Sequence, residues 1–342
     1  KNALINSAFN FDKTSIYYRY EKNNLAINNQ PLKVFGVQQD FKFPTVYLAN
    51  KKANEAEHNV EIANYNIKLQ SLKRDVYLAY YNLSYVQKRV KTITYLDSLY
   101  QNFAIAAKRR FELGETNYLE MITAQSKQKQ LHTMYKQELQ NVIIKREQLI
   151  KVVQVDGYII NTGITTKLEL ESMSKEDNVG LQYFDNSIAY YEAVSKKEKQ
   201  NLLPDLSVEY FQGSNSTINN TIKGYQFGIK IPLLFGGTSS KIKASKIAQE
   251  IIAEQKDNYK TAFNVAHNTL LAQLEQHGEA VSYYETQGQL LASEIIKTAE
   301  SSFKHGEIDF FQYIQSIENA KEIELTYLEN LNKYNQTIIA IN

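Results

Sequence analysis

Apolar residues recur at alternating intervals of three and four along the first half of the chain, the spacing of a coiled-coil seam or a long helical bundle. Residues 45–113 contain neither proline nor glycine. The pattern therefore predicts one helix over 45–113, about 100 Å long at ~1.5 Å per residue. Its seam consists of Leu69, Leu72, Val76, Ala79, Leu83, Val86, Val90, Ile93, Leu96, Tyr100, Phe103, Ala107 and Phe111.

The second half of the chain has the same helical plan. A second long helix is predicted over 238–305, with Gly278 and Gly288 as points where it can loosen or kink. Return helices are predicted over 117–153 and 309–341. Each runs antiparallel to the long helix before it, because the connection between them is short.

Two segments of alternating polarity precede each long helix. They predict strands over 14–20, 33–43, 205–212 and 224–235. Asn-rich loops at 21–31 and 213–224 separate the strands of each pair. In the last strand, the apolar positions are Tyr225, Phe227, Ile229, Ile231 and Leu233. The predicted fold class is mainly α with a small β part.

An offset of 192 residues relates the two halves. "RRFELGETNYLE" at 109–120 returns as "SSFKHGEIDFFQ" at 301–312, and Phe35 and Gly36 match Phe227 and Gly228. We therefore expect a duplicated strand-strand-long helix-helix unit, with repeats 1–153 and 181–342 joined by a linker at 154–180. A shorter helix at 181–201 precedes the second strand pair and has no counterpart before the first. We expect the chain to be a piece of a longer precursor, since it starts at Lys1 without a signal-like segment.

Composition narrows the function classes. The net charge is +2 and no dense basic patch is present, which argues against a nucleic-acid partner. The absence of cysteine excludes thiol catalysis and thiolate metal sites. No Gly-rich phosphate loop or nucleophile constellation is present, so an enzyme is not expected.

Four strands with an apolar face have open edges, and unpaired backbone groups in a membrane cost several kcal/mol each. Closing such a sheet requires more strands than one chain supplies, which predicts a ring of several copies. The long helices would project from it as a hollow cylinder, with Gly114 and Gly306 where each long helix reverses.

The order of these elements resembles the TolC-like outer membrane factor family over essentially the whole chain, 1–342. The motifs that carry the resemblance are "DFKFP", "IPLLFGG", "RFELGETN", "SFKHGEID" and "LLPDLSVEY". The segments "SLKRDVYLAYYNL" and "LDSLYQNFAIAAKRRFELGETNYLEMITAQ" look most similar to the outer-membrane-factor region of heavy-metal RND efflux systems. In such systems this module can be fused to the inner-membrane pump.

The resemblance implies a homotrimeric duct in the bacterial outer membrane that extends into the periplasm. Four strands from each of three chains would close a 12-stranded β-barrel, continued by an α-helical tunnel. The duct would need no cofactor and would conduct substrate passively, with heavy-metal cations as one candidate cargo. Its implied partners are a periplasmic adaptor (membrane fusion protein), an inner-membrane RND pump and outer membrane lipid.

The resemblance also assigns roles to the helix reversals. In the family, equivalent tips meet the adaptor, which makes adaptor-docking candidates of Phe111, Gly114, Glu115, Phe303, Gly306 and Glu307. The alternative is that they only reverse the helix. Family members also carry a ring of acidic side chains past the second tip. Here those positions are glutamines, which departs from the pattern, so the candidate entrance constriction consists of Glu120, Gln312 and Gln315.

The residues also allow other interpretations. Glu55 and His58 have the one-turn spacing of metal ligands, but no second such pair accompanies them, so a solvated helix face is favoured over a metal site. A soluble coiled-coil scaffold would not explain the paired strands. A periplasmic adaptor would have one helical hairpin with a β-rich flank, whereas this chain predicts two hairpins.

Overall fold

The computed structural model describes residues 1–22, 30–155, 166–170, 178–216 and 221–342. Most of the linker at 154–180 and most of the Asn-rich loop at 21–31 lie outside these residues, as do four positions of the loop at 213–224. The chain forms two compact units, Lys1–Ile67 with Lys175–Thr261 and Lys68–Ser174 with Ala262–Asn342. Helices α2 (Pro44–Glu112) and α5 (Gly236–Tyr283) each contribute to both units.

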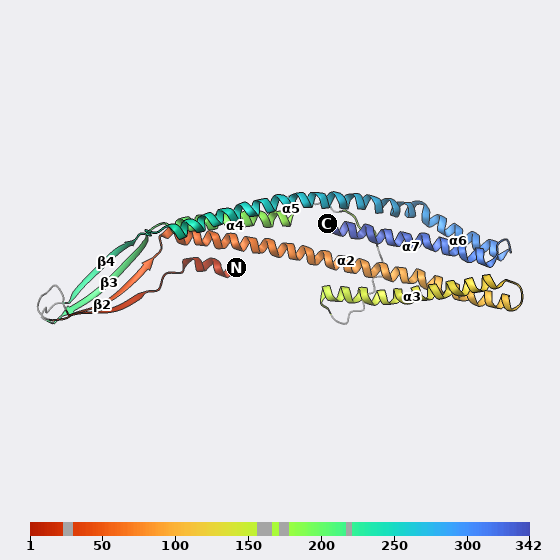
Figure 1. Ribbon diagram of the computed structural model, residues 1–342, viewed down its shortest axis with the longest axis horizontal. Helices are drawn as coiled ribbons and strands as arrows, with labels where there is room; N and C mark the ends of the chain where they lie inside the picture. The colour runs from red at the N-terminus through yellow and green to blue at the C-terminus, as the bar shows by residue number, and fades with distance from the viewer. Residues whose placement is uncertain (23–29, 156–165, 171–177, 217–220) are drawn as a thin grey trace. The chain divides into compact units, whose positions relative to one another are not determined.

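The first unit contains a four-stranded antiparallel sheet, in which the strands follow the order of the chain (Figure 1). Tyr18 pairs with Phe35, and Tyr210 pairs with both Val37 and Tyr225. The predicted fold class, mainly helical with a small sheet, is confirmed. The strands are β1 (Ser15–Glu21), β2 (Leu32–Phe41), β3 (Asp205–Asn215) and β4 (Ile222–Lys230).

Strand β4 is shorter than the alternation predicts. It ends at Lys230, whereas the pattern continues through Ile231 and Leu233 to 235. Proline lacks the backbone N–H that a strand ladder needs, so Pro232 cannot extend the pairing. Residues 231–235 therefore connect the strand to α5 without regular structure.

Short helices cover the start of α2 in the first unit. The ring of Phe9, at the end of η1 (Asn6–Phe9), stacks on Tyr47 at 6.3 Å between centroids, and Phe11 packs edge-on against Phe41 at 5.9 Å. Helix α1 (Asn2–Ile5) lies beside α2, where Lys1 pairs with Glu57 at 2.6 Å. Helix α4 (Val179–Gln200) is tied to the start of α2 by the Thr45 hydroxyl, which donates to Gln200 at 2.6 Å.

The second unit consists of helical hairpins. Helix α2 reverses into α3 (Tyr118–Val153), and α6 (Gln289–Lys304) reverses into α7 (Phe310–Ile341) (Figure 1). One buried cluster joins three of these helices. It contains Ile93, Leu96, Tyr100, Phe103 and Ala107 of α2, Ala124 and Leu131 of α3, and Ile314 and Leu325 of α7.

The predicted seam of α2 holds over only part of its length. Its positions from Ile93 to Ala107 belong to the buried cluster. Leu69 and Leu72 are 36% and 49% exposed in the single chain, so burial of the seam at that end stays a prediction. The heptad spacing predicts an apolar stripe on the helix, but it does not identify the helix that packs against that stripe.

The second long helix contains a π-helical segment. Helix α5 passes through Gly278 without a break, and the π segment η3 (Tyr284–Gly288) separates it from α6. One π turn re-aims the side chains that follow it, and such turns are frequent at functional sites. The ring of Tyr284 stacks on Tyr327 of α7, with centroids 4.0 Å apart.

Polar contacts cross the helical core. The Tyr100 hydroxyl donates to Glu318 at 2.5 Å, and Lys127 of α3 pairs with the same carboxylate at 2.7 Å. Asn335 is fully buried and holds the described part of the linker, because its side chain donates to the carbonyl of Thr166 and accepts from the backbone N–H of Leu168, both at 2.9 Å.

Burial and the hydrogen bond to Glu318 raise the pKa of Tyr100 above its ordinary value of 10.0. The folded state keeps the phenol proton to higher pH than the unfolded state, so this stabilisation is present below pH 10 and is lost as the pH rises further. We expect Tyr100→Phe to be about 1 kcal/mol less stable at pH 8. Above pH 10 the difference should shrink, by up to about 1.4 kcal/mol per pH unit.

Thermal unfolding followed by circular dichroism at pH 8 and pH 11 measures this effect. Tyr95→Phe is the matched control, since Tyr95 lies on the same helix and is 42% exposed. A difference between wild type and Tyr100→Phe that stays constant over this pH range would contradict the prediction.

Candidate functional site at the helix reversals and the sheet face

Both helix reversals have the same backbone geometry. Gly114 has φ 75° and Gly306 has φ 74°, the left-handed region in which glycine carries no side-chain penalty. At the first reversal, the Gly114 N–H donates to the carbonyl of Phe111 at 3.0 Å and the Glu115 N–H to that of Arg110 at 2.8 Å. This pair of bonds is a Schellman motif, which satisfies the last carbonyls of a helix.

The second reversal repeats these bonds 192 residues later. The Gly306 N–H donates to the carbonyl of Phe303 at 3.1 Å, and the Glu307 N–H to that of Ser302 at 2.9 Å. A Cβ atom built on either glycine has no neighbour within 4 Å. The glycine is therefore needed for the backbone angle and not for space.

Matched N-caps start the return helices. The Asn117 side chain accepts from the Glu120 N–H at 2.9 Å, and the Asp309 side chain accepts from the Gln312 N–H at 2.8 Å. The Gln312 side chain also accepts from the Asp309 N–H at 3.1 Å, which completes a capping box. The sequence interpretation missed Asn117 and Asp309, although both stand at cap positions 192 residues apart.

The three candidate constriction residues have different local roles. Glu120 accepts from Thr116 and pairs with Arg110 at 3.4 Å, so its carboxylate is engaged within the first reversal. Gln312 takes part in the capping box, and Gln315 donates to Asn319 at 3.1 Å. Whether they narrow an entrance stays a prediction.

The reversals expose apolar and acidic side chains together. Phe111 is 37% exposed and packs on Tyr118, and Phe303 is 39% exposed and stacks on Tyr313. Glu115 lies 3.9 Å from Arg110, and Glu307 accepts from Ser302 at 2.8 Å. Leu113 and Leu119, which the sequence interpretation passed over, enlarge the exposed apolar surface of the first reversal.

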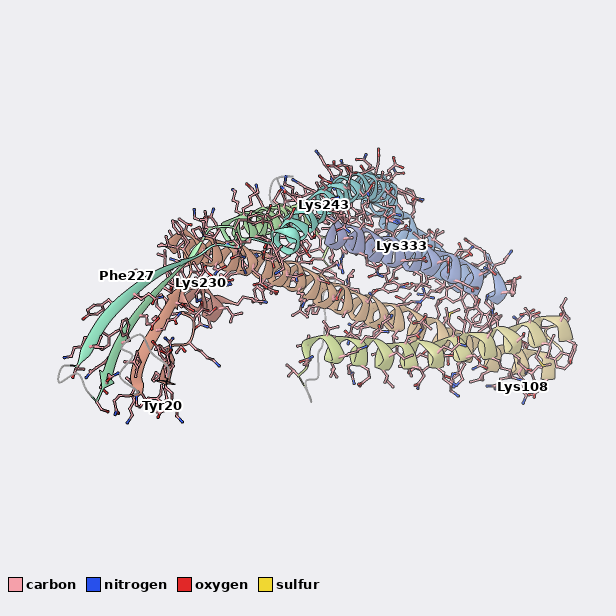
Figure 2. All side chains as sticks on the ribbon, turned by 60° about the vertical axis from the view of Figure 1, so that its left-hand side comes forward. Tyr20, Lys108, Phe227, Lys230, Lys243 and Lys333 are labelled. Carbon is pink, nitrogen blue, oxygen red and sulfur yellow. The ribbon has the colours of Figure 1, made fainter. Side chains whose placement is uncertain are left out.

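The sheet is the second candidate surface. Register and alternation place most of its apolar side chains on one face, and they are largely exposed: Phe227, labelled in Figure 2, is 78% exposed. We name this the apolar sheet face. It consists of Ile16, Tyr18, Tyr20, Phe35, Val37, Phe41, Leu206, Val208, Tyr210, Tyr225, Phe227 and Ile229.

The opposite face of the sheet is polar. Tyr17 donates to Glu209, and Lys230, also labelled in Figure 2, pairs with Asp40. Of the aromatics near the strands, Tyr18, Tyr20, Tyr210 and Tyr225 lie on the apolar sheet face. Tyr17 and Phe211 alternate onto the polar face, and Tyr47 is buried.

No cofactor or metal site emerges from the described side chains. In that part of the chain no three His, Cys, Asp or Glu residues are grouped to hold a metal ion. Glu55 lies 3.7 Å from Lys51, one turn away on α2. None of the described helices is long and apolar enough to cross a membrane.

No protein-family model and no curated protein matches the sequence. Solved structures do match. A membrane protein from Pseudomonas aeruginosa has a TM-score of 0.77 at 11% identity, over 99% of this chain and 84% of that chain. The channel-forming protein CusC gives 0.75 at 13% identity over 99% and 84%. The outer-membrane channel OprN gives 0.74 at 11% identity over 99% and 83%.

The likeness at these identities is one of fold. The chain has the fold of outer membrane channels, and the resemblance to TolC-like outer membrane factors is confirmed at that level.

Replacing Gly114 or Gly306 with alanine should weaken its Schellman motif by about 1 kcal/mol, because an L side chain disfavours a positive φ. We expect roughly fivefold faster amide exchange at Glu115 or Glu307, measured by hydrogen–deuterium exchange. Asparagine should cost less than alanine, because it tolerates this conformation.

Gly278→Ala is the matched control. It lies inside α5, where a Cβ would meet Tyr334 at an ordinary 3.5 Å, so alanine should slow exchange around it. Equal exchange in all three alanine variants and wild type would show that the left-handed geometry is unimportant.

Proposed function

We propose that the chain is the outer membrane export duct of a tripartite efflux pump and that it conducts substrate passively from pump and adaptor to the exterior. The observation that carries the proposal is the apolar sheet face. A soluble protein rarely exposes so many apolar side chains on one face of a sheet, whereas a barrel strand in a membrane presents apolar side chains to lipid and polar ones to the lumen. The fold shared with outer membrane channels supports it.

The open edges of the sheet support a closed ring of copies, which we propose is a homotrimer. Within the described residues, β1 and β4 stand at the two ends of the strand order, each with one neighbour. Pairing β4 of one copy with β1 of the next would remove both edges, and three copies would give the 12-stranded barrel that the resemblance implies. The polar face, with Glu209, Asp40 and Lys230, would then line the lumen.

The helical hairpins would form the periplasmic tunnel. Their reversals expose Phe111, Phe303 and the acidic residues beside them, which suits contact with a periplasmic adaptor. The inner-membrane RND pump, the heavy-metal cargo and fusion to the pump rest on the sequence resemblance alone. Purified trimer that conducts ions across a planar lipid bilayer would support the duct, and a protein recovered as a soluble monomer without detergent would overturn it.

A charge on the apolar sheet face should prevent membrane insertion. Phe227→Lys would place an ammonium group in lipid, at a cost of about 2–4 kcal/mol near the midplane. We expect less trimer in the outer membrane fraction, measured by quantitative immunoblotting. The control is Gln226→Lys. Gln226 is the adjacent residue, lies on the polar face, and stands opposite Glu209 in the strand register. Equal recovery of both variants would contradict the assignment of the faces.

Apolar contacts at the reversals should be needed for docking. The double variant Phe111→Gln and Phe303→Gln should lower export and the amount of adaptor cross-linked in cells, while membrane recovery of the trimer stays unchanged. Ile105→Gln, another exposed apolar residue of α2, is the control. Normal export by the double variant would show that the reversals only connect the helices and are not needed for adaptor docking.

A further inference from the structure

A cavity of about 310 Å³ lies beside the π-helical segment, between the end of α5, η3 and α7. Three tyrosine rings line it, from Tyr283, Tyr284 and Tyr327. Asn319 and Asn330 contribute amide groups, and Glu322 is the one charged lining residue among the described residues. The volume suits a small ligand, since drug-sized pockets begin at about 300 Å³.

The rings are fixed by local packing. Tyr284 and Tyr327 are stacked with an interplanar angle of 14°, and the Tyr327 hydroxyl donates to Glu285 at 3.4 Å. A Cβ on Gly288 would lie 3.2 Å from the Tyr284 ring and 3.4 Å from Ile323. The glycine that ends the π segment therefore lets the ring approach α7 closely.

The charge of the cavity favours a cation. Glu322 is exposed, and its carboxylate has no ion-pair partner among the described residues. The neighbouring Lys321 is held by Glu324 at 2.8 Å and lies over the Tyr95 ring at 5.1 Å. Burial raises the pKa of Tyr284 and raises that of Tyr327 to about 12, so both phenols stay neutral at physiological pH.

A second cavity, of about 180 Å³, lies between α2, α3 and α7 and shows the contrast. Arg89 and Lys127 line it together with Glu318, Glu322 and Glu329. Charges of both signs face one another there, and it lacks aromatic rings. Glu322 borders both cavities, and the two cations of the second cavity are engaged by other acids, Arg89 by Glu138 and Lys127 by Glu318. The cavity beside η3 differs in its lining of tyrosine rings.

We propose that the cavity beside η3 binds small aromatic ammonium cations. Ring faces attract an ammonium group, more strongly when it is partly desolvated, and an adjacent carboxylate adds to the attraction. The chain uses the same chemistry nearby, where the Lys167 ammonium lies 5.4 Å from the Tyr334 ring. The ammonium group would contact one of the lining tyrosines, and an aromatic ring on the same ligand would stack on another.

The cavity shares a helix face with a candidate constriction residue. Gln315, Asn319, Glu322 and Thr326 recur at intervals of four, three and four on α7. If the duct function proposed above holds, organic cations would meet this cavity along the export path. That relevance rests on the proposed function, whereas binding itself does not.

Saturation-transfer NMR on the full chain in detergent tests the inference, with benzyltrimethylammonium as the ligand and benzyl alcohol as the neutral comparison. We expect the cation to bind more tightly than the alcohol. Tyr284→Leu and Tyr327→Leu should each weaken binding of the cation by roughly two- to tenfold, while the corresponding phenylalanine variants retain it. Glu322→Gln, at an exposed position that folding does not need, should weaken it about threefold.

Two matched controls lie outside the cavity, Tyr95→Leu on α2 and Glu294→Gln on α6. They should bind as wild type does. Equal binding of cation and alcohol, or equal loss in cavity and control variants, would overturn the proposed site. A protein that binds the cation but does not conduct in bilayers would instead overturn the duct and leave the site standing.

Discussion

Unpaired backbone groups at the edges of the sheet are the constraint on which the proposed assembly depends. The four strands satisfy one another internally, but β1 and β4 each face outward without a further neighbour in the described chain. Water can satisfy such groups at low cost, and hydrocarbon cannot. Under the proposed function, a sheet whose exposed face carries Phe227, Tyr225 and Ile229 would therefore pair with copies of itself to enter a membrane.

The helices are constrained by water and by one another, not by lipid. Their polar surfaces require water on most sides, and their burial is concentrated in a cluster around Phe103 and Ile314. Ion pairs such as Lys127 with Glu318 border that cluster. Such half-buried pairs contribute little net stability but penalise mispairing of the helices. Apolar packing and charge pairing thus select the same hairpin arrangement.

Much of this architecture is readable from local pattern. Apolar spacing with a period of two locates the strands, and spacing of three to four locates the helices. The 192-residue offset identifies two equivalent reversals. The cap residues Asn117 and Asp309 follow from the same offset. The sequence marks Gly288 as a point where the helix can loosen, but it does not predict a π segment at Tyr284–Gly288, because that depends on how Tyr284 and Ile323 pack. The exposure of Leu69 cannot be read from the sequence either, because it depends on which helix packs against the apolar seam of α2.

The duplication also shows where the repeats have diverged. Both reversals keep a glycine, because the backbone has a positive φ there, and a cap acceptor for the return helix. They also share a phenylalanine and a glutamate. Past the cap, Glu120 in the first repeat faces Arg110, whereas Gln312 in the second closes a capping box. The first repeat adds the Arg110–Glu120 ion pair to a neutral Asn117 cap, whereas the second relies on hydrogen bonds at the Asp309 cap. Salt screens the partly exposed ion pair more strongly than the short cap hydrogen bonds, so the two reversals of one chain should respond differently to ionic strength.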